Sequence, residues 1–401
     1  MPKTEYAHRW KILAFCYLIV LTIGATYMGF PALFESLNQD FNLTKTQQGL
    51  LINVFTLLGI VISIPVGIYA GRFGFRKICI LGFSLFIIGY ILCAVAGSYE
   101  QLLAGRLLCG GGSSLLSIIV PQVIAQWFRG REIGMAMGIL NTSFPLGVTI
   151  GYQAFPRLSA AFSWHVTQWL LLGMLLLSAV AFFAWYRPAP AADKEKPERS
   201  LPGWRDNFKV LDRIWLLSLV WVLFNAGILS YSTYAAGYFH AIGHSLVSAN
   251  FLAGLVFTVS IFCSPVAGWM LDRFKITTRI IISGCLGLSV LMALIPHLAG
   301  WELILSVGIG LVVAAVPPAV FSLPVAWIEN RHLALAYGII NSIFCLGASI
   351  APGLVGNIWD RQQSYPLIFL IMGGFCLLGG LAAFGLLRQK DTQASPVRAS
   401  A

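Results

Sequence analysis

The sequence has few charged residues, and this scarcity excludes most soluble folds. Asp, Glu, Lys and Arg make up 10% of the 401 residues, whereas hydrophobic residues make up 58% and the mean hydropathy is +0.81. Soluble globular domains carry about 25% charged residues. The composition therefore predicts an integral membrane protein that is surrounded by the lipid bilayer.

Acidic residues are missing from the middle of every predicted membrane span. The 15 Asp and Glu residues all fall in loops, tails or helix ends. Ionisable groups inside a bilayer are costly and usually functional, so their absence argues against a mid-span carboxylate relay and against a buried acid that selects cationic drugs. A membrane-embedded enzyme or sensor would also need such an acid, a His cluster or a nucleophile–base pair, so we expect no enzymatic activity.

Signs of disulfides, metal sites and a cleaved leader are also lacking. All eight cysteines lie in predicted spans, which is typical of small apolar packing residues: Cys16, Cys79, Cys93, Cys109, Cys263, Cys285, Cys345 and Cys376. The first apolar run is too long for the core of a signal peptide and reads as a retained helix. We expect no metal and no cofactor.

The charged residues that are present delimit the spans, because a membrane-crossing helix needs roughly 20 apolar residues. Ten charge-free runs each have the length of one helix: 11–35, 45–72, 77–100, 106–129, 132–157, 157–187, 279–302, 302–329, 331–360 and 361–388. The run 213–272 is about twice as long and contains "HAIGH" at 240–244, a polar turn. The sequence therefore predicts twelve membrane-spanning helices.

The basic residues predict the orientation. With a cytoplasmic N-terminus, the outer loops hold only Lys45, Arg157 and Arg361, Arg106 lies within a span, and all other Lys and Arg residues fall in inner loops and tails. This asymmetry follows the positive-inside rule. We expect both termini in the cytoplasm of a cell membrane, such as a bacterial inner membrane, and the net charge of +11 needs no nucleic-acid partner.

A repeated phrase divides the chain into halves. "GILNTSFPLG" at 138–147 returns as "GIINSIFCLG" at 338–347, and the same offset pairs Trp127 with Trp327 and Pro65 with Pro265. The segment 187–213, rich in Pro and charge, reads as a linker. We predict an all-α membrane protein with six-helix bundles at 1–186 and 214–388, related by a pseudo-two-fold axis along the membrane normal, and a cytoplasmic tail at 389–401.

Three motifs resemble signatures of the major facilitator superfamily. "GIYAGRFGFRK" at 67–77 resembles its loop signature between the second and third helices, "GWMLDRFK" at 268–275 resembles the second copy of that loop, and "RLLCGGG" at 106–112 resembles its fourth-helix signature. The resemblance covers essentially the whole chain. It implies a transporter whose substrate site lies between two six-helix halves.

The two loop motifs predict a cytoplasmic gate that closes the inner side through ion pairs and contacts with helix ends. Where the resembling proteins have an Asp before the first Arg, this chain has Gly71, so the closing role shifts towards Asp272, with Arg129 or Arg131 as its partner. For each basic residue, a role in orientation alone remains an equal alternative. The predicted gate residues are Arg72, Arg76, Lys77, Arg131, Asp272 and Arg273.

Arg106 is the most informative candidate for the substrate site, because it is a cation within a span. It lies about 8 Å from the start of its helix if that helix begins near Gln101. It either snorkels outward as a structural residue or attracts an anionic substrate, or the carboxylate of a zwitterion.

Mid-span polar groups complete the predicted site. Buried amides and hydroxyls need partners in hydrocarbon, so they either bond neighbouring helices or line a cavity. Such residues recur in the repeated phrase, in the first span and in the seventh: Tyr27, Asn141, Asn225, Tyr231, Tyr234 and Asn341.

Together these features favour a secondary transporter that works by alternating access. The preferred cargo is a small organic or inorganic anion or an amino-acid-like zwitterion, with a loose similarity to cyanate-permease-like and monocarboxylate-type branches of the superfamily. Export of drugs or metabolites is the alternative. A coupling proton or ion and a monomeric state are further expectations.

Overall fold

The computed structural model describes all residues except 1–2, 29, 129–131, 188–203 and 395–401. The described part contains twelve long helices, each apolar enough to cross a membrane, so the predicted number of spans is confirmed. Helices satisfy their own backbone hydrogen bonds, which hydrocarbon cannot do for them. The spanning helices are α1 (Lys3–Met28), α3 (Lys45–Phe73), α4 (Phe75–Ala94), α5 (Tyr99–Phe128), α6 (Ile133–Ala161), α7 (Trp164–Trp185), α8 (Trp204–Ala241), α9 (Leu246–Phe274), α10 (Thr277–Leu294), α11 (Glu302–Trp327), α12 (Leu333–Gln362) and α13 (Tyr365–Ala394).

Three short elements join these helices. The 3₁₀ turn η1 (Phe30–Leu33) and α2 (Phe34–Phe41) link α1 to α3, and η3 (Asn330–His332) precedes α12. Helix α3 begins with a capping box, in which Thr44 Oγ1 accepts from the Gln47 N–H at 3.2 Å and Gln47 Oε1 accepts from the Thr44 N–H at 2.9 Å. This reciprocal pair satisfies backbone donors that the first turn leaves free.

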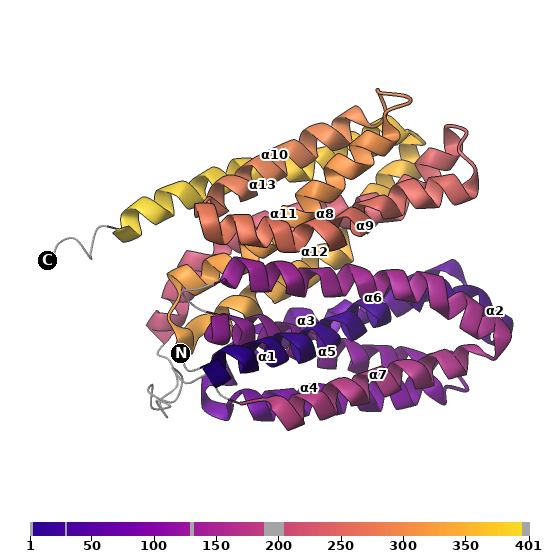
Figure 1. Cartoon of the computed structure of the whole chain (residues 1–401). Coiled ribbons are helices and arrows are strands. Elements are labelled where there is room, and N and C mark those ends of the chain that lie inside the picture. Colours follow the sequence, from indigo (N-terminus) through magenta and orange to yellow (C-terminus); the bar gives the residue numbers. More distant parts are fainter. Residues whose placement is uncertain (1–2, 29, 129–131, 188–203, 395–401) are drawn as a thin grey trace, which may run out of the picture.

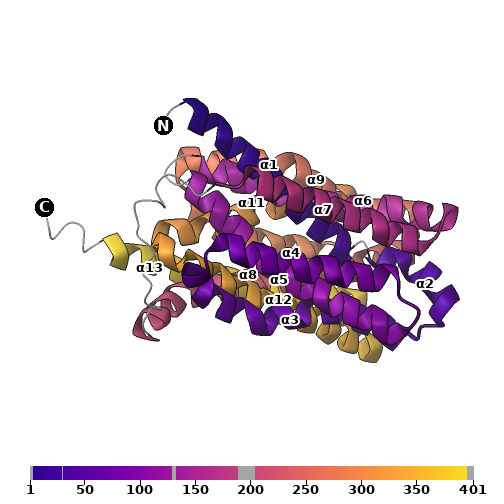
Figure 2. The ribbon, with the colours of Figure 1, turned by 90° about the horizontal axis from the view of Figure 1, so that it is seen from below.

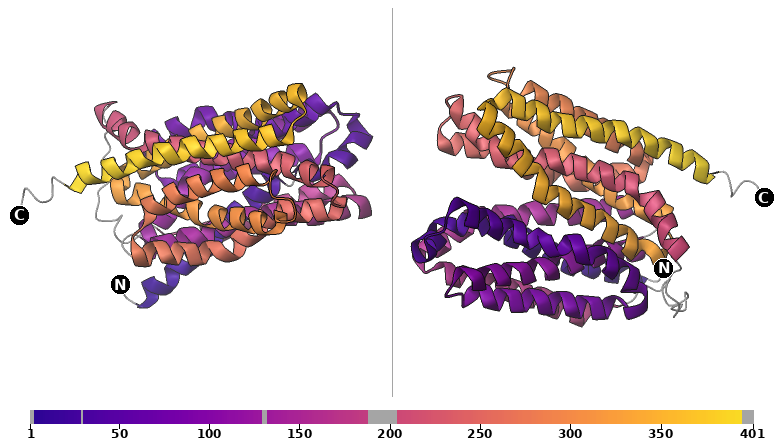
Figure 3. Two further views of the ribbon diagram at one scale, coloured as in Figure 1. Left: turned by 90° about the horizontal axis from the view of Figure 1, so that it is seen from above. Right: turned by 180° about the vertical axis from the view of Figure 1, so that it is seen from behind.

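The helices form two groups, α1–α7 and α8–α13, that lie one above the other in Figure 1 and again in the view from behind in Figure 3. The view from below in Figure 2 shows mainly the first group. Helices α1 and α8 begin, and α13 ends, at one end of the bundle, which we call the terminal end; the opposite end is the far end. Of the predicted linker 187–213, residues 188–203 lie outside the described part and α8 already begins at Trp204.

The two halves pack through two helix pairs, α3 with α12 and α6 with α9. The repeated phrase supplies α6 and α12 with a glycine at the crossing point. A Cβ on Gly138 would overlap the carbonyl oxygen of Ser264, and one on Gly338 would overlap that of Ser63. Small residues let membrane helices approach closely, so the repetition in the sequence marks two matching contacts between the halves.

Candidate functional site

A cavity of about 250 Å³ lies between the halves and is lined by α1, α3, α5 and α6 on one side and by α8, α9, α11 and α12 on the other. Its walls are mainly apolar and aromatic. The aromatic side chains on the cavity wall are Tyr27, Phe55, Phe144, Trp221, Phe224, Phe257, Phe321, Tyr337 and Phe344. No Asp, Glu, Lys, Arg or His is among the described residues that line it.

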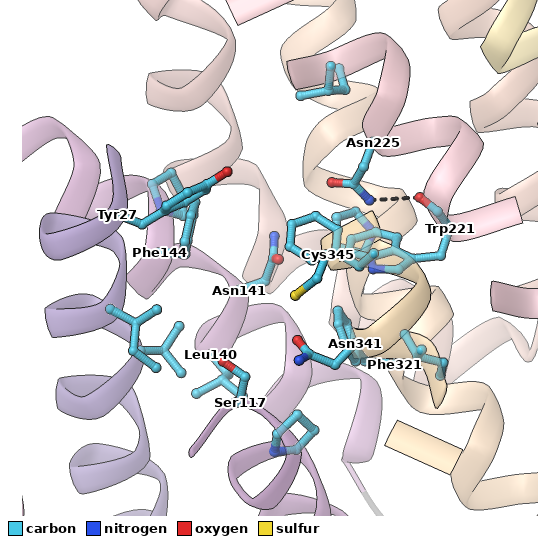
Figure 4. A pocket seen from close by; sticks show the side chains of 18 of the residues that line it. Tyr27, Ser117, Leu140, Asn141, Phe144, Trp221, Asn225, Phe321, Asn341 and Cys345 are labelled. Atoms are coloured by element: carbon cyan, nitrogen blue, oxygen red, sulfur yellow. Dashed lines mark hydrogen bonds between the residues drawn. The ribbon is translucent and has the colours of Figure 1, made fainter. Parts of the chain in front are cut away.

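Three asparagines supply amide groups to this cavity (Figure 4). Asn141 of α6 donates through Nδ2 to Ser264 Oγ of the opposite half at 3.2 Å. Asn341 of α12 donates through Nδ2 to Ser63 Oγ of the opposite half at 2.9 Å. Asn141 and Asn341 therefore line the cavity and also join the halves, at equivalent places in the two copies of the repeat.

The other predicted substrate-binding residues fall into two sets. Tyr27 and Asn225 line the cavity, and Asn225 Nδ2 donates to the carbonyl oxygen of Trp221 in its own helix at 2.8 Å. Tyr231 and Tyr234 lie outside the cavity wall. Tyr231 is fully buried with its hydroxyl 3.4 Å from Ser306 Oγ, and Tyr234 donates to the Pro352 carbonyl at 3.1 Å.

Arg106 also lies outside the cavity wall, and its side chain is 1% exposed. Nε donates to the Leu51 carbonyl at 3.1 Å and Nη1 to the Thr26 carbonyl at 2.9 Å, which ties α5 to α3 and α1. The guanidinium lies between the rings of Phe30 and Phe55, with Cζ 4.1 and 4.6 Å from their centroids.

The third nitrogen of Arg106, Nη2, is buried and has no hydrogen-bond partner among the described residues. An unsatisfied buried donor costs about 1–3 kcal/mol, whereas a desolvated cation over an aromatic face gains about 2 kcal/mol. The two rings therefore offset most of this cost. On the cavity side, Phe55 stacks on Tyr27 with centroids 5.2 Å apart, so one ring separates the guanidinium from Tyr27.

At the terminal end, Asp272 makes the clearest contact of the predicted gate. Its Oδ1 accepts from the backbone N–H of Gly134 and its Oδ2 from that of Met135, both at 2.8 Å, at the start of α6. A carboxylate at a helix N-terminus satisfies free donors and interacts favourably with the helix dipole. The acid of the second half thus caps a helix of the first half by backbone contacts.

The structure gives less information on the other predicted gate residues. Arg76, Lys77 and Arg273 are exposed. Arg129 and Arg131, the expected partners of Asp272, lie outside the described residues, and so does the side chain of Arg72.

Glycines add to the gate contact. A Cβ on Gly134 would come within 2.6 Å of the Gly268 carbonyl oxygen, and one on Gly67 within 2.7 Å of the Leu335 Cα. The terminal ends of the two halves are therefore in backbone contact.

Sequence reasoning missed two groups of residues in this region. Ser63 and Ser264, which anchor the asparagines, were not singled out, although each lies in mid-span beside Pro65 or Pro265 of the repeat. The aromatic wall was also missed, because Trp and Phe are common in membrane helices and only the packed structure shows which of them face the cavity.

Comparison with known proteins agrees with this architecture. A family model described as Major Facilitator Superfamily matches residues 14–309 and 240–401. The chain is 22% identical to the hexuronate transporter of Bacillus subtilis over 88% of each chain, and 22% identical to the probable L-galactonate transporter of Escherichia coli over 88% of this chain and 84% of the relative. It is 24% identical to the fosmidomycin resistance protein of Escherichia coli over 88% of this chain and 87% of the relative.

Solved structures show the same fold. The human organic anion transporter superposes with a TM-score of 0.78 at 16% identity, covering 96% of this chain and all of that one. The Escherichia coli fucose:proton symporter superposes with a TM-score of 0.76 at 14% identity, covering 95% and 98%. With twelve apolar helices in two groups and a family match over most of its length, the chain belongs to the Major Facilitator Superfamily and is a multi-pass membrane transporter, not an enzyme.

Proposed function

We propose that the protein is a secondary transporter that moves a small organic acid across the membrane by alternating access. The observation that carries this proposal is the cavity between the halves, which both halves line and where Asn141 and Asn341 form hydrogen bonds from one half to the other. Transporters built from two repeats place the cargo at such an interface and rock the halves around it. A monomer provides the whole site.

The terminal end is the gate that is closed in this structure. The hydrogen bonds from the start of α6 to Asp272 of α9, the Gly134–Gly268 contact and the Gly67–Leu335 contact hold the halves together there. The positive-inside distribution makes this end cytoplasmic, so we assign the structure to the state closed towards the cytoplasm. Opening to the cytoplasm then requires these contacts to separate.

Two observations support an anionic or zwitterionic cargo. Relatives with similarity over most of the chain are named for the carboxylates hexuronate and L-galactonate. Others are named for sulfoacetate, nitrite or nitrate and favour a permanently charged anion instead. Arg106 also places a buried positive charge near the cavity, with no acidic partner among the described residues. The fosmidomycin resistance protein, in contrast, supports the alternative of drug or metabolite export.

In this state Arg106 acts on a cargo through its electrostatic field and not through direct contact. Cζ of Arg106 lies 4.6 Å from the centroid of Phe55, which lies 5.2 Å from that of Tyr27. Across both steps, at an effective dielectric constant of about 20, a unit charge attracts an anion by about 2 kcal/mol. Removing a carboxylate from water without a charged partner costs several kcal/mol. The field of Arg106 therefore attracts an organic acid but does not by itself offset the loss of water around its anion.

The test is exchange in proteoliposomes that contain the purified protein. We expect vesicles preloaded with unlabelled glucuronate, galactonate or benzoate to accumulate the corresponding labelled acid transiently, because an alternating-access carrier exchanges cargo across the membrane. Vesicles with the Gly138→Ala variant, whose new methyl group overlaps Ser264, serve as a control with impaired rocking. Exchange of fosmidomycin but of none of these acids would favour the export alternative.

A further inference from the structure

The hydrogen bonds at the cavity wall determine which end of each asparagine amide, Nδ2 or Oδ1, faces its partner in the protein. Ser63 Oγ donates its single proton to the Gly59 carbonyl at 2.6 Å, so it can only accept from Asn341. Ser264 Oγ likewise donates to the Ala314 carbonyl at 2.9 Å and can only accept from Asn141. A serine hydroxyl carries one donor hydrogen, so each of these asparagines must turn its Nδ2 towards the serine.

Asn225 is oriented in the same way. Its partner is the Trp221 carbonyl oxygen, which can only accept, and Figure 4 shows the amide oxygen of Asn225 on the side away from that bond. The Oδ1 atoms of Asn141, Asn225 and Asn341 have no hydrogen-bond partner among the described residues. Each amide thus offers a cargo one acceptor oxygen and at most one remaining N–H.

Hydroxyl groups of the wall follow the same pattern. Ser113, Ser260 and Tyr337 donate to the backbone carbonyls of Gly110, Phe257 and Phe321 at 2.9, 2.8 and 2.8 Å. Their protons are used within the protein, so towards the cavity these groups offer lone pairs. The hydroxyls of Tyr27 and Ser117 also line the cavity and can donate, so the polar part of the wall offers donors as well as acceptors, but its described residues include no cation.

An ionised carboxylate fits this wall poorly. It carries acceptors only, so the amide oxygens cannot bind it, and its charge would be held by neutral N–H and O–H donors alone, without a cation in contact. The protonated carboxyl group fits well, because its O–H donates to an amide oxygen while its C=O accepts from the amide N–H. The charge of Arg106 favours the anion, but the stacked rings of Phe55 and Tyr27 lie in between.

The titratable groups that face the cavity offer no other route for a proton near neutral pH. Among the described lining residues these are Tyr27, Tyr337 and Cys345, and Arg106 lies behind the rings. Ordinary pKa values are about 10 for tyrosine, about 8.5 for cysteine and above 12 for arginine. No carboxylate or imidazole, whose ordinary pKa values are about 4 and about 6.5, is among the described lining residues.

We infer that the cavity accepts its organic-acid cargo in the protonated, uncharged form, held by the amide groups of Asn141, Asn225 and Asn341, so that one proton crosses with each carboxyl group. This inference rests on the proposed function. It makes the cargo itself the proton carrier of a symport, in place of an acidic side chain. It also excludes permanently charged anions such as nitrate or sulfonates, and it favours acids with an apolar or aromatic body.

The experiment compares matched ligands by thermal stabilisation of the purified protein from pH 5 to pH 8. The ligands are benzoate, butyrate and lactate, their neutral amides, and the permanent anions benzenesulfonate, butanesulfonate and nitrate. A ligand that binds only the folded state raises its stability in proportion to its occupancy. The amides do not titrate in this range, so they correct for the effect of pH on the protein.

We expect the amides to bind equally at all pH values, the sulfonates and nitrate not to bind, and the apparent Kd of a carboxylic acid to rise about tenfold per pH unit, because only its protonated fraction is competent. Binding of a sulfonate as tight as that of its carboxylate, or carboxylate binding that does not weaken with rising pH, overturns the inference and leaves the proposed function standing. If no carboxylic acid binds at any pH, the proposed function fails with it.

A single substitution tests whether Asn225 takes part in binding the cargo. Asn225→Leu removes one amide without touching the bonds between the halves, and we expect it to weaken the binding of benzoate at pH 5 and of benzamide by about five- to tenfold. Ser218→Ala is the matched control, because Ser218 lies on the same helix and makes the same kind of bond, to the Ile214 carbonyl, outside the cavity. Equal binding by the two variants contradicts the assignment of Asn225.

Discussion

Some buried polar residues of this transporter join helices and others line the cavity. Arg106 belongs to the first group. Two of its nitrogens bind the carbonyls of Thr26 and Leu51, and two rings cover its faces. Hydrogen bonds to a charged group contribute about 1.5–3 kcal/mol each. The side chain is therefore a clamp between three helices as well as a source of positive field.

The first prediction separates these roles. Arg106→Gln should lower the melting temperature in detergent by several degrees, because it removes both carbonyl contacts and the cation–ring contacts. Uptake of benzoate per folded molecule should stay within about threefold of the unmodified protein, since the protonated cargo does not contact the guanidinium. An unchanged melting temperature together with lost uptake per molecule would instead make Arg106 a direct ligand of the cargo.

The candidate site could be predicted from sequence only in part. Asn141 and Asn341 were found because the repeat places an amide in two apolar spans, where it needs a partner. Tyr231 and Tyr234 follow an equally polar pattern but lie outside the cavity, because the facing helices decide which side of α8 meets it. Arg106 was identified as exceptional, but its neighbours Phe30 and Phe55 come from other helices and leave no local signal.

Pairs of helices from the two halves meet at the proposed gate, and each pair has a glycine of the repeat at its crossing. The spans themselves were predictable, because hydrocarbon thickness fixes their length and charged residues end them. The crossings were not, since small residues occur along almost every helix and only the packed structure shows that Gly138 meets Ser264 and Gly338 meets Ser63. This leads to two predictions at the scale of helix pairs.

The second prediction concerns the α6–α9 and α3–α12 crossings. Gly138→Ala or Gly338→Ala should force the terminal ends apart and expose the cavity on that side. Cys345 lines the cavity and can serve as the only remaining cysteine. Its labelling by an impermeant maleimide from the terminal side should rise at least tenfold, whereas Gly173→Ala, where a Cβ meets nothing within 4 Å, should leave it unchanged. Equal labelling in all three variants would show that these crossings do not close the gate.

The third prediction concerns the cap that Asp272 places on α6. Asp272→Asn keeps one acceptor but loses the charge, and a charged cap contributes about 0.5–2 kcal/mol. The population open at the terminal end should therefore grow by about two- to thirtyfold, and labelling of Cys345 from that side should increase accordingly. Arg273→Gln, next to it and exposed, is the control. Unchanged labelling in Asp272→Asn would limit this carboxylate to packing or orientation.

At the scale of the whole molecule, the two halves enclose one cavity and touch most closely on one side of it. Composition and charge placement predicted the class and the number of spans, because these follow from the thickness of the bilayer, and the repeated phrase predicted the division into halves. The state of the molecule could not be predicted, since it depends on which contacts between the halves are made, and these contacts join residues that are far apart in the sequence.

The central claim is that the halves rock around the cavity, and the most direct measurement is a pair of distances between spin labels in a cysteine-free background. One pair joins Arg76 and Arg279 at the terminal end, and the other joins Ser98 and Leu298 at the far end; all four residues are exposed. Adding benzoate at pH 5 should populate a longer terminal-end distance and a shorter far-end distance in the same proportion of molecules. One fixed distance for each pair, with and without the acid, would contradict alternating access.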